Sequence, residues 1–349
     1  MKDYFKDIRP WLIAGPCSAE SEEQVLTTAR ALKELGVNVF RAGIWKPRTH
    51  PGCFEGIGEK GLSWLRKVQE QTGMKVCTEV ANATHVKACL DAGVDMLWIG
   101  ARTTSNPFLV QEIAESLSGK DVPVLIKNPV NADLGLWIGA IERFRAQNVR
   151  NLGVIHRGFS TFDKIRYRNA PHWRYAIEMR TRFPELPFFC DPSHMAGSTE
   201  FIAEISQRAL DLGLDGLMIE SHCCPQCALS DASQQLTPAA LGGLVRSLRV
   251  RDQIAGNDET LESFRTRIDA VDDEIVRLLA ERMGISREIG KYKKDKNIAI
   301  IQSARFEELL AAAKRLGATY GLDPDYLGRI FNIIHDASAA EQNKIISEK

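Results

Sequence analysis

The chain of 349 residues lacks the features that mark several classes of protein. No stretch approaches the roughly 20 consecutive apolar residues that a membrane-spanning helix needs, and residues 1–10 carry charges but no apolar core for export. Net charge is absent as well, because 45 lysines and arginines balance 45 aspartates and glutamates, so no overall field draws the protein to nucleic acid or to an anionic membrane. We therefore expect a cytoplasmic protein that binds neither and recognises charge only at local sites.

A disulfide framework is also not expected, although the chain has eight cysteines. Five of them lie in or beside strand-like segments of a long chain, which favours reduced thiols. Cys223, Cys224 and Cys227 gather in one loop. The last two could bind a second Zn²⁺, but no other pair of ligands is evident nearby, so we expect loop thiols there. A further hypothesis is that one of these loop cysteines can be oxidised to a disulfide with Cys17.

The first two thirds of the chain predict a closed barrel. Between residues 12 and 251, strand-like runs that end in polar residues alternate with helical patterns eight times, and Gly36, Gly73, Gly93 and Gly213 mark four helix ends. Eight such units make a (β/α)₈ or TIM barrel, whose chemistry lies at the carboxyl ends of its strands. We predict this α/β domain for residues 1–252, with strands at 12–18, 37–46, 75–82, 96–103, 123–129, 152–158, 187–193 and 216–222.

The last third predicts a small all-α helical bundle. Residues 253–260 resemble a polar linker, and residues 261–349 contain three helices, at about 261–292, 302–320 and 324–346. Heptad-like spacing makes an apolar seam on the first helix, formed by Leu261, Phe264, Ile268, Val271, Ile275, Leu278, Ile285 and Ile289. Arg282 falls within this seam. Burial of an unpaired arginine is costly, so its position indicates a bound anion or a carboxylate partner.

Four metal-binding side chains follow the ends of predicted strands. They are Cys17 after the first strand, His194 after the seventh, and Glu220 and Asp231 at and beyond the end of the eighth. Closure of the barrel makes the first and eighth strands neighbours, so all four are predicted to meet on one arc of the barrel mouth. Thiolate, imidazole and two carboxylates suit Mn, Fe, Co or Zn without selecting one.

Cations gather at the same predicted strand ends. Arg41, Lys46, Arg102, Lys127 and Arg157 would point into one cavity, which indicates a small substrate with several negative charges. Lys46-Pro47-Arg48-Thr49 adds another cation and a hydroxyl, as a second phosphate site would require.

At this point the motifs resemble a known family, 3-deoxy-D-arabino-heptulosonate-7-phosphate synthase of type I beta. The matching segments are Gly15-Pro16-Cys17-Ser18, Lys46-Pro47-Arg48-Thr49, Ile99-Gly100-Ala101-Arg102, Asp191-Pro192-Ser193-His194 and Ala228-Leu229-Ser230-Asp231. The resemblance implies condensation of phosphoenolpyruvate with erythrose 4-phosphate, the first step of the shikimate pathway. It also implies a divalent metal on Cys17, His194, Glu220 and Asp231, with Mn²⁺ first and Fe²⁺, Co²⁺ or Zn²⁺ as alternatives.

The same resemblance distributes the substrate contacts. It gives phosphoenolpyruvate to Arg41, Lys46, Arg102, Lys127 and Arg157, and the aldose phosphate to Arg48 and Thr49. Glu79 and Lys127 are candidates for handling the proton of the water that adds to phosphoenolpyruvate, and a structural salt bridge is the alternative for Glu79.

Three features of the barrel depart from the family pattern, and a related enzyme is an alternative. Asn128-Pro129 follows Lys127 where relatives often have an Arg/Lys-Gly pair, His156 precedes Arg157 where many have glutamate, and the loop at 221–227 is unusually rich in cysteine. The alternative is octulosonate-phosphate synthase, which uses arabinose 5-phosphate. Its second-strand motif is of the Asn-Arg-Ser type, whereas this chain has Pro47-Arg48-Thr49.

The C-terminal segment resembles the α-helical chorismate mutase. That resemblance implies rearrangement of chorismate to prephenate, with Lys293 and Gln342 at the ether oxygen. Gln302 and Phe306 stand where some members have acidic residues. The implied ligand contacts are Arg265, Arg282, Lys293, Arg305, Ser338 and Gln342.

The mutase resemblance also implies an assembly. Its bundle is an intertwined homodimer in which Arg265 reaches the partner's site, and a higher oligomer is left open. A different role for the helical domain is that of a regulatory sensor, which binds chorismate or prephenate and inhibits the barrel. Both roles can coexist.

Overall fold

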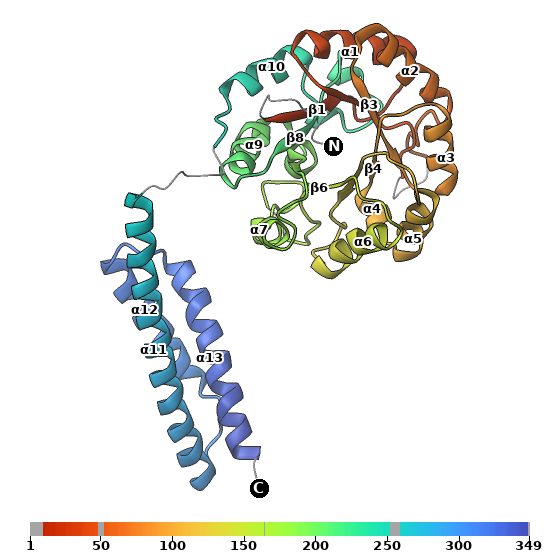
Figure 1. The fold of residues 1–349 in the computed structure, drawn as a ribbon. Helices are drawn as coiled ribbons and strands as arrows, with labels where there is room; N and C mark the ends of the chain where they lie inside the picture. The colour runs from red at the N-terminus through yellow and green to blue at the C-terminus, as the bar shows by residue number, and fades with distance from the viewer. Residues whose placement is uncertain (1–9, 48–51, 164, 252–258, 348–349) are drawn as a thin grey trace. The chain divides into compact units, whose positions relative to one another are not determined.

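The computed structural model describes residues 10–47, 52–163, 165–251 and 259–347, and all that follows concerns these residues. The chain divides into two compact units, Met1–Gln253 and Ile254–Lys349 (Figure 1). Of the predicted linker at 253–260, residues 253–258 lie outside the described part, and Glu259 already begins a helix. No described helix is both long and apolar enough to cross a membrane.

The first unit is a closed barrel of eight parallel strands in the order of the sequence, as predicted. β1 and β8 close it, with Trp11 opposite Gly216 and Gly15 opposite Glu220. The strands are β1 (Trp11–Gly15), β2 (Val39–Arg41), β3 (Lys75–Val80), β4 (Met96–Ile99), β5 (Val124–Lys127), β6 (Leu152–His156), β7 (Phe188–Cys190) and β8 (Gly216–Glu220).

Helices ring the barrel on the outside (Figure 1). Their starts follow from local chemistry, because the side chains of Ser21, Asn82, Asn106 and Thr237 accept hydrogen bonds from the first free backbone N–H groups. The main helices are α1 (Glu22–Glu34), α2 (Lys60–Thr72), α3 (Ala83–Asp91), α5 (Pro107–Ser116), α6 (Leu134–Ala146), α7 (Trp173–Arg182), α9 (Ile202–Asp211) and α10 (Pro238–Ser247).

Two apolar cores hold this unit together. One lies between the strands and the surrounding helices, and it includes Phe40, Trp137 and Phe144, all fully buried. The other fills the inside of the barrel, so the barrel is a packed core and the site can lie only at its mouth. The inner residues are Trp11, Ile13, Val39, Cys77, Met96, Trp98, Leu125, Ile155, Phe189 and Met218.

Several strands end earlier than predicted, and this moves two site residues onto short helices. β4 ends at Ile99 and α4 (Ala101–Thr104) follows at once, so Arg102 is on a helix rather than on the strand. β7 ends at Cys190 because the Asp191 side chain accepts a hydrogen bond from His194 N at 3.1 Å and starts α8 (Pro192–Ala196). His194 therefore lies on α8.

The second unit has three helices, α11 (Glu259–Asp295), α12 (Ser303–Thr319) and α13 (Pro324–Ser347). Both α11 and α12 pack against α13. The predicted seam on α11 is not buried, because Phe264 is 51% exposed, Ile268 60% and Val271 59%. Arg282 is only partly buried and donates to Ser338 Oγ at 2.6 Å, so its partner in this chain is a hydroxyl and not a carboxylate.

Candidate active sites

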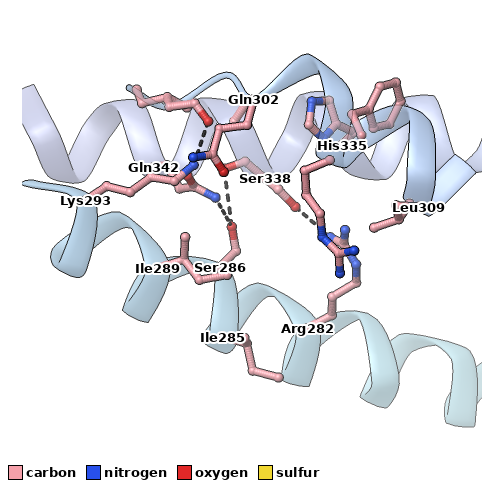
Figure 2. A pocket seen from close by; sticks show the side chains of 14 residues that line it. Arg282, Ile285, Ser286, Ile289, Lys293, Gln302, Leu309, His335, Ser338 and Gln342 are labelled. Carbon is pink, nitrogen blue, oxygen red and sulfur yellow. Dashed lines mark hydrogen bonds between the residues drawn. The ribbon is translucent and has the colours of Figure 1, made fainter. Parts of the chain in front are cut away.

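The helical unit contains a cavity of about 350 Å³ between its helices. Figure 2 shows side chains from α11 and α13 that point into it. Five of the six predicted ligand contacts line it, namely Arg282, Lys293, Arg305, Ser338 and Gln342. The sixth, Arg265, does not, and it forms an exposed ion pair with Glu262 on its own helix.

Hydrogen bonds fix several of these groups in place (Figure 2). Lys293 Nζ donates to Ile300 O at 2.6 Å, and Gln342 Nε2 donates to Ser286 Oγ at 3.1 Å. Gln342 Oε1 is buried and has no hydrogen-bond partner among the described residues. Ser286 holds Gln342 in place, and no sequence motif pointed to it.

The charged side chains that line this cavity, among the described residues, are all basic: Arg282, Lys293 and Arg305. None of the described residues that line it is acidic, since Gln302 and Phe306 occupy the positions where acidic residues were the alternative. The Phe306 ring stacks on His335 at a centroid distance of 3.9 Å. Such a cavity fits a small dianion with an apolar ring.

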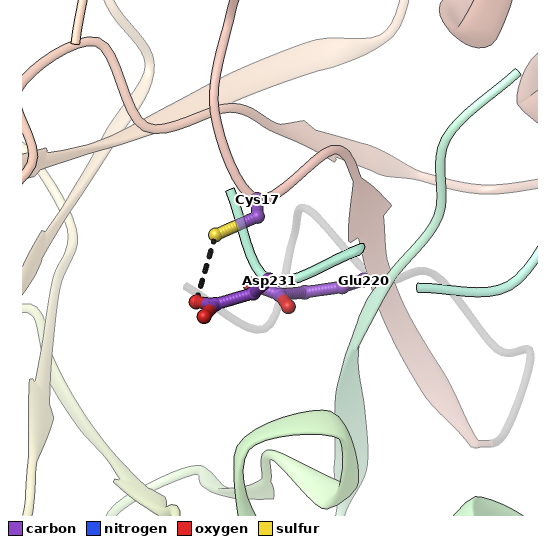
Figure 3. A group of neighbouring side chains, drawn as sticks. All are labelled: Cys17, Glu220 and Asp231. Carbon is purple, nitrogen blue, oxygen red and sulfur yellow. Dashed lines mark hydrogen bonds between the residues drawn. The ribbon is translucent and has the colours of Figure 1, made fainter. Parts of the chain in front are cut away.

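The barrel mouth brings three of the four predicted metal ligands together. One ligand atom each of Cys17, Glu220 and Asp231 lies within 4.8 Å of the other two (Figure 3). The β1–β8 pairing explains this, because Cys17 follows β1, Glu220 ends β8 and Asp231 follows it. Cys17 Sγ donates to Asp231 Oδ2 at 3.3 Å.

His194 stands beside this cluster rather than in it. Its Nδ1 lies 2.8 Å from Asp191 Oδ2, and its Nε2 faces Glu220 Oε1 at 3.7 Å. Burial lowers the pKa of His194, although Asp191 and Glu220 oppose the shift. A neutral imidazole whose Nδ1 is turned to a carboxylate presents Nε2 as a ligand, so the four residues fit a divalent cation.

The charges in the cluster agree with that fit. Burial raises the pKa of Cys17 to about 12, and the nearby Glu220 adds to the shift, so without a cation Cys17 is a neutral thiol. Burial alone would raise the pKa of Asp231, but His194 and Arg168 outweigh it and hold the pKa below its usual value. Glu220 Oε1 is buried and accepts no hydrogen bond from any described residue, and Arg41 Nη1 is its ion-pair neighbour at 3.3 Å. A divalent cation would satisfy the lone pairs that this oxygen has left.

A cavity of about 70 Å³ opens beside the cluster and carries most of the predicted cations. Lys46, Arg102, Lys127 and Arg157 line it. Arg41 does not, because it is fully buried beneath the cavity, with Nη1 3.3 Å from Glu220 Oε1 and Nη2 donating to Cys17 O at 3.2 Å. Its predicted place in the ring of cations needs this correction. Arg48 and Thr49 lie outside the described residues.

Glu79 lies on the wall of this cavity. Its Oε2 accepts a hydrogen bond from Trp98 Nε1 at 3.1 Å, and it forms no ion pair with a described residue. Gly100 makes room for it, because a Cβ at that position would come 2.0 Å from Glu79 Oε1. The described residues thus give the salt-bridge alternative for Glu79 no partner.

Two charged residues of the site were missed in the sequence. Asp191 Oδ2 accepts from Lys127 Nζ at 2.7 Å as well as facing His194. Burial would raise its pKa, but His194 and Lys127 outweigh this and hold the pKa well below normal. Arg168 lines the cavity and donates to Asp231 Oδ1 at 3.0 Å. Asp191 directly follows a strand and could have been found by that rule, whereas Arg168 lies in a loop without such a signal.

Two of the departures from the family pattern, Asn128 and His156, have a structural use. Asn128 Oδ1 accepts from Arg157 N at 2.7 Å and Nδ2 donates to Gly158 O at 2.8 Å, which fixes the loop after β6. His156 is fully buried beside Trp137, its Nε2 lies 2.5 Å from Pro171 O, and burial lowers its pKa to about 4. It is therefore a neutral donor where a glutamate would be charged.

The cysteine-rich loop contains a disulfide, contrary to the expectation of loop thiols. Cys224 and Cys227 are bonded to each other, because one turn of 3₁₀ helix, η3 (Pro225–Cys227), brings their Cα atoms to 5.4 Å. The six other cysteines, Cys17 among them, are free. The structure therefore pairs neither loop cysteine with Cys17, and the bonded pair is not available as a thiolate zinc site.

Comparison with known proteins gives both units a family. Residues 5–253 match the model of the DAHP synthetase I family, and residues 264–343 match that of chorismate mutase type II. The chain is 34% identical over 245 residues to phospho-2-dehydro-3-deoxyheptonate aldolase of Thermotoga maritima, with 68% of each chain covered. It is 29% identical over 269 residues to 2-dehydro-3-deoxyphosphooctonate aldolase of Legionella pneumophila, with 70% of this chain and 92% of that protein covered.

Solved structures agree with the first match. The crystal structure of DAHP synthase from Thermotoga maritima superposes with a TM-score of 0.61 at 32% identity, covering 69% of this chain and 70% of that one. A truncated form of the same enzyme gives 0.59 at 30% identity, covering 69% and 87%. The chain therefore belongs to the DAHP synthetase I family, carries a chorismate mutase type II segment after its barrel, and is an enzyme with two activities.

Proposed function

We propose that the barrel condenses phosphoenolpyruvate with erythrose 4-phosphate to 3-deoxy-D-arabino-heptulosonate 7-phosphate. The observation that carries this is the meeting of Lys46, Arg102, Lys127 and Arg157 in one cavity with His194 and Asp231 on its wall. Four cations match the phosphate and carboxylate of phosphoenolpyruvate. The family match and the Thermotoga relative, whose name is that of the heptonate aldolase, support the reaction.

Each residue has a proposed task in that reaction. A divalent cation held by Cys17, His194, Glu220 and Asp231, with Mn²⁺ as the first expectation and Fe²⁺, Co²⁺ or Zn²⁺ as alternatives, would act as a Lewis acid on the aldehyde oxygen of the aldose phosphate. Arg41 holds Glu220 and the Cys17 carbonyl from below, and so positions two of the ligands. Asp191 orients His194 and Lys127 together.

The remaining step is the addition of water at C2 of phosphoenolpyruvate as its C3 bonds to the aldehyde carbon. The aldehyde oxygen takes up a proton, the added water loses one, and C2 then expels inorganic phosphate to become the ketone carbon. Lys127 and Glu79 both face the cavity, and either can hold or move the proton of that water. Trp98 fixes Oε2 of Glu79 by a hydrogen bond. Oε1 of Glu79 accepts no hydrogen bond from a described residue and can receive that proton. Arg48 and Thr49 are proposed to bind the aldose phosphate.

The aldose distinguishes this reaction from its alternative. The octonate aldolase relatives would take arabinose 5-phosphate, and they match the chain at 29% identity against 34% for the heptonate aldolase. A coupled assay of phosphate release with each aldose tests the choice. We expect turnover with erythrose 4-phosphate, and turnover with arabinose 5-phosphate alone would overturn it.

We propose that the helical cavity converts chorismate to prephenate. Arg282, Lys293 and Arg305 line it and none of its described lining residues is acidic, which supports the binding of a dianion. The rearrangement needs no acid, base or covalent intermediate, so holding the reactive conformer is enough. Lys293 and Gln342 Nε2 are the proposed donors to the ether oxygen, and both are held by the hydrogen bonds described above.

The exposed seam on α11 supports a homodimer through the helical unit, with Arg265 completing the partner's cavity. A higher oligomer, a cytoplasmic location and feedback inhibition of the barrel by prephenate or chorismate belong to the same proposal. Removal of residues 254–349 tests the last point. If the shortened chain keeps its inhibition by prephenate, the helical unit is not the sensor; if the intact chain shows no mutase turnover, it is a sensor only.

A further inference from the structure

The loop that follows β8 carries a feature that the proposed reactions do not use. Cys224 and Cys227 are joined by a disulfide around the single turn η3. Cys227 is exposed and Cys224 partly buried, so a reagent can reach the pair from solvent. Two cysteines separated by two residues form the arrangement of many reversible dithiol and disulfide pairs.

This disulfide stands midway between two of the proposed metal ligands. Cys224 follows Glu220 by four residues, and Asp231 follows Cys227 by four. Glu220 is fixed at the end of β8, whereas Asp231 depends on the loop for its position. A change in the conformational freedom of this loop therefore alters the position of Asp231 more than that of Glu220.

A chain of polar contacts leads from the disulfide to the proposed metal ligands. Cys224 N donates to His222 Nδ1 at 2.9 Å, and His222 Nε2 lies 3.6 Å from Glu20 Oε2. The other oxygen of Glu20 accepts from Leu229 N at 2.9 Å and from Ser18 Oγ at 3.1 Å. Glu20 thus joins the two ends of the loop.

The last step reaches the ligands themselves. Ser18 Oγ and Ser230 Oγ lie 2.5 Å apart, and these residues are the direct neighbours of Cys17 and Asp231. The loop, Glu20 and the two serines therefore form one polar network that ends at the cluster.

We propose that Cys224 and Cys227 are a redox modification site, which a dithiol protein of the thioredoxin class reduces and a protein disulfide re-forms, and that reduction weakens cation binding at the barrel mouth. The cation part of this inference rests on the proposed function of the barrel. A closed ring of four residues limits the conformations of the loop, so the disulfide form should hold Asp231 better than the dithiol form.

The exchange balances without any other reactant. A thiolate of the reductant attacks the exposed Cys227 sulfur, the bond to Cys224 breaks, and the Cys224 sulfur leaves with the electron pair and takes up a proton. The second thiolate of the reductant then attacks the reductant's first sulfur, which is bonded to Cys227 in the mixed disulfide. The Cys227 sulfur leaves and is protonated. Two electrons and two protons pass to the pair, and the reductant becomes a disulfide.

The first measurement follows the thiols in the full-length chain. The protein is alkylated before and after treatment with thioredoxin, and the modified cysteines are located by mass spectrometry. We expect Cys224 and Cys227 to be protected before reduction, labelled after it, and protected again after treatment with a disulfide, while buried Cys17 stays unlabelled throughout. Labelling of the pair in untreated protein, or failure to re-form the bond, would overturn the redox site.

The second measurement follows cation affinity by calorimetric titration with Mn²⁺. We expect the reduced chain to bind Mn²⁺ about threefold to tenfold more weakly than the oxidised chain, from the loop freedom that reduction restores. The double variant C224S/C227S should bind like the reduced chain and ignore thioredoxin. The C223S variant is the matched control, because Cys223 is a free thiol of the same loop, and it should keep the full difference.

The two measurements test the redox site and its coupling to the cation separately. Equal Mn²⁺ affinity in both redox states would overturn the coupling to the cluster. A chain that binds no divalent cation in either state would overturn both the coupling and the proposed function of the barrel. The alkylation pattern needs no cation, so it tests the redox pair by itself.

Discussion

The two cavities of this protein are assembled in opposite ways. In the barrel, ligand side chains come from segments more than 200 residues apart, and a closed, buried sheet holds them. In the helical unit, the lining residues lie on three consecutive helices and on the connection between the first two, and a long apolar face of α11 is exposed. The first arrangement needs no second chain to position its described residues, whereas the second leaves apolar surface and Arg265 without a role inside one chain. Cooperation between copies should therefore matter to one activity and not to the other.

Removal of divalent cations should separate the two activities most strongly. Treatment with EDTA is expected to lower condensation by about a thousandfold or more, since a Lewis acid contributes several kcal/mol to such a step. Chorismate rearrangement should be unchanged, because its cavity is lined by Arg282, Lys293 and Arg305, and none of its described lining residues is acidic and able to hold a cation. Both rates are measured on the same sample, and Mn²⁺ is added back as the control. Loss of both activities together would contradict the comparison.

Arg282→Ala should remove mutase turnover and spare the barrel. Arg282 is a cavity cation fixed by Ser338 at 2.6 Å, and loss of a charged contact to the dianion should lower kcat/KM by about a hundredfold. Arg277→Ala is the matched control on the same helix, because Arg277 is exposed and its ion pairs with described residues are those with Glu274 and Glu281 on the surface. Equal losses in the two variants would show that the helix, and not the cavity, was affected.

The same contrast explains what the sequence could and could not foretell. A strand end can be recognised in the sequence as a polar residue that follows an apolar run. By this rule Cys17, Lys127 and Glu220 could be assigned to the barrel mouth from the sequence. Arg41 was misplaced because its depth depends on packing inside the barrel, where its guanidinium lies 4.8 Å from the centre of the Trp98 ring.

Loop residues were harder to foresee, since nothing local fixes where a loop folds back. Arg168 and the glutamines that hold the cluster belong to this class, for Gln234 Nε2 donates to Glu220 Oε2 at 2.7 Å and Gln235 Oε1 accepts from Cys17 N at 2.9 Å. The disulfide between Cys224 and Cys227 was not predicted for the same reason, because it depends on the single turn of η3 in this loop. The heptad pattern of α11 was real, but it does not say whether its partner lies in the same chain.

A charge placed on the exposed seam tests that partner. Val271→Lys should convert the homodimer to a monomer in sedimentation experiments and lower mutase activity by about tenfold, through loss of the partner's charged contact at each cavity. Condensation should be spared. Asp273→Lys is the control, because Asp273 is also exposed on α11 but lies outside the seam. A mutase-active monomer would show that each helical unit is complete by itself.

The smallest expected effect concerns the stability of the barrel at acid pH. His156 has its pKa lowered from 6.5 to about 4 by burial, so the folded barrel favours the neutral ring. Its contribution is fully present above pH 6.5 and is lost as the pH falls toward 4, because the unfolded chain binds the proton first. The loss of unfolding free energy should reach about 1 kcal/mol by pH 5.5.

All six tryptophans lie in the barrel unit, so denaturant unfolding followed by tryptophan fluorescence reports this unit alone. His156→Gln should remove this part of the pH dependence. The circular-dichroism change that is not accompanied by a fluorescence change reports the helical unit, and it should be the same in variant and parent. If the variant and the parent lose stability in parallel between pH 6.5 and 5.5, other groups cause the acid sensitivity of the barrel, and the buried imidazole does not.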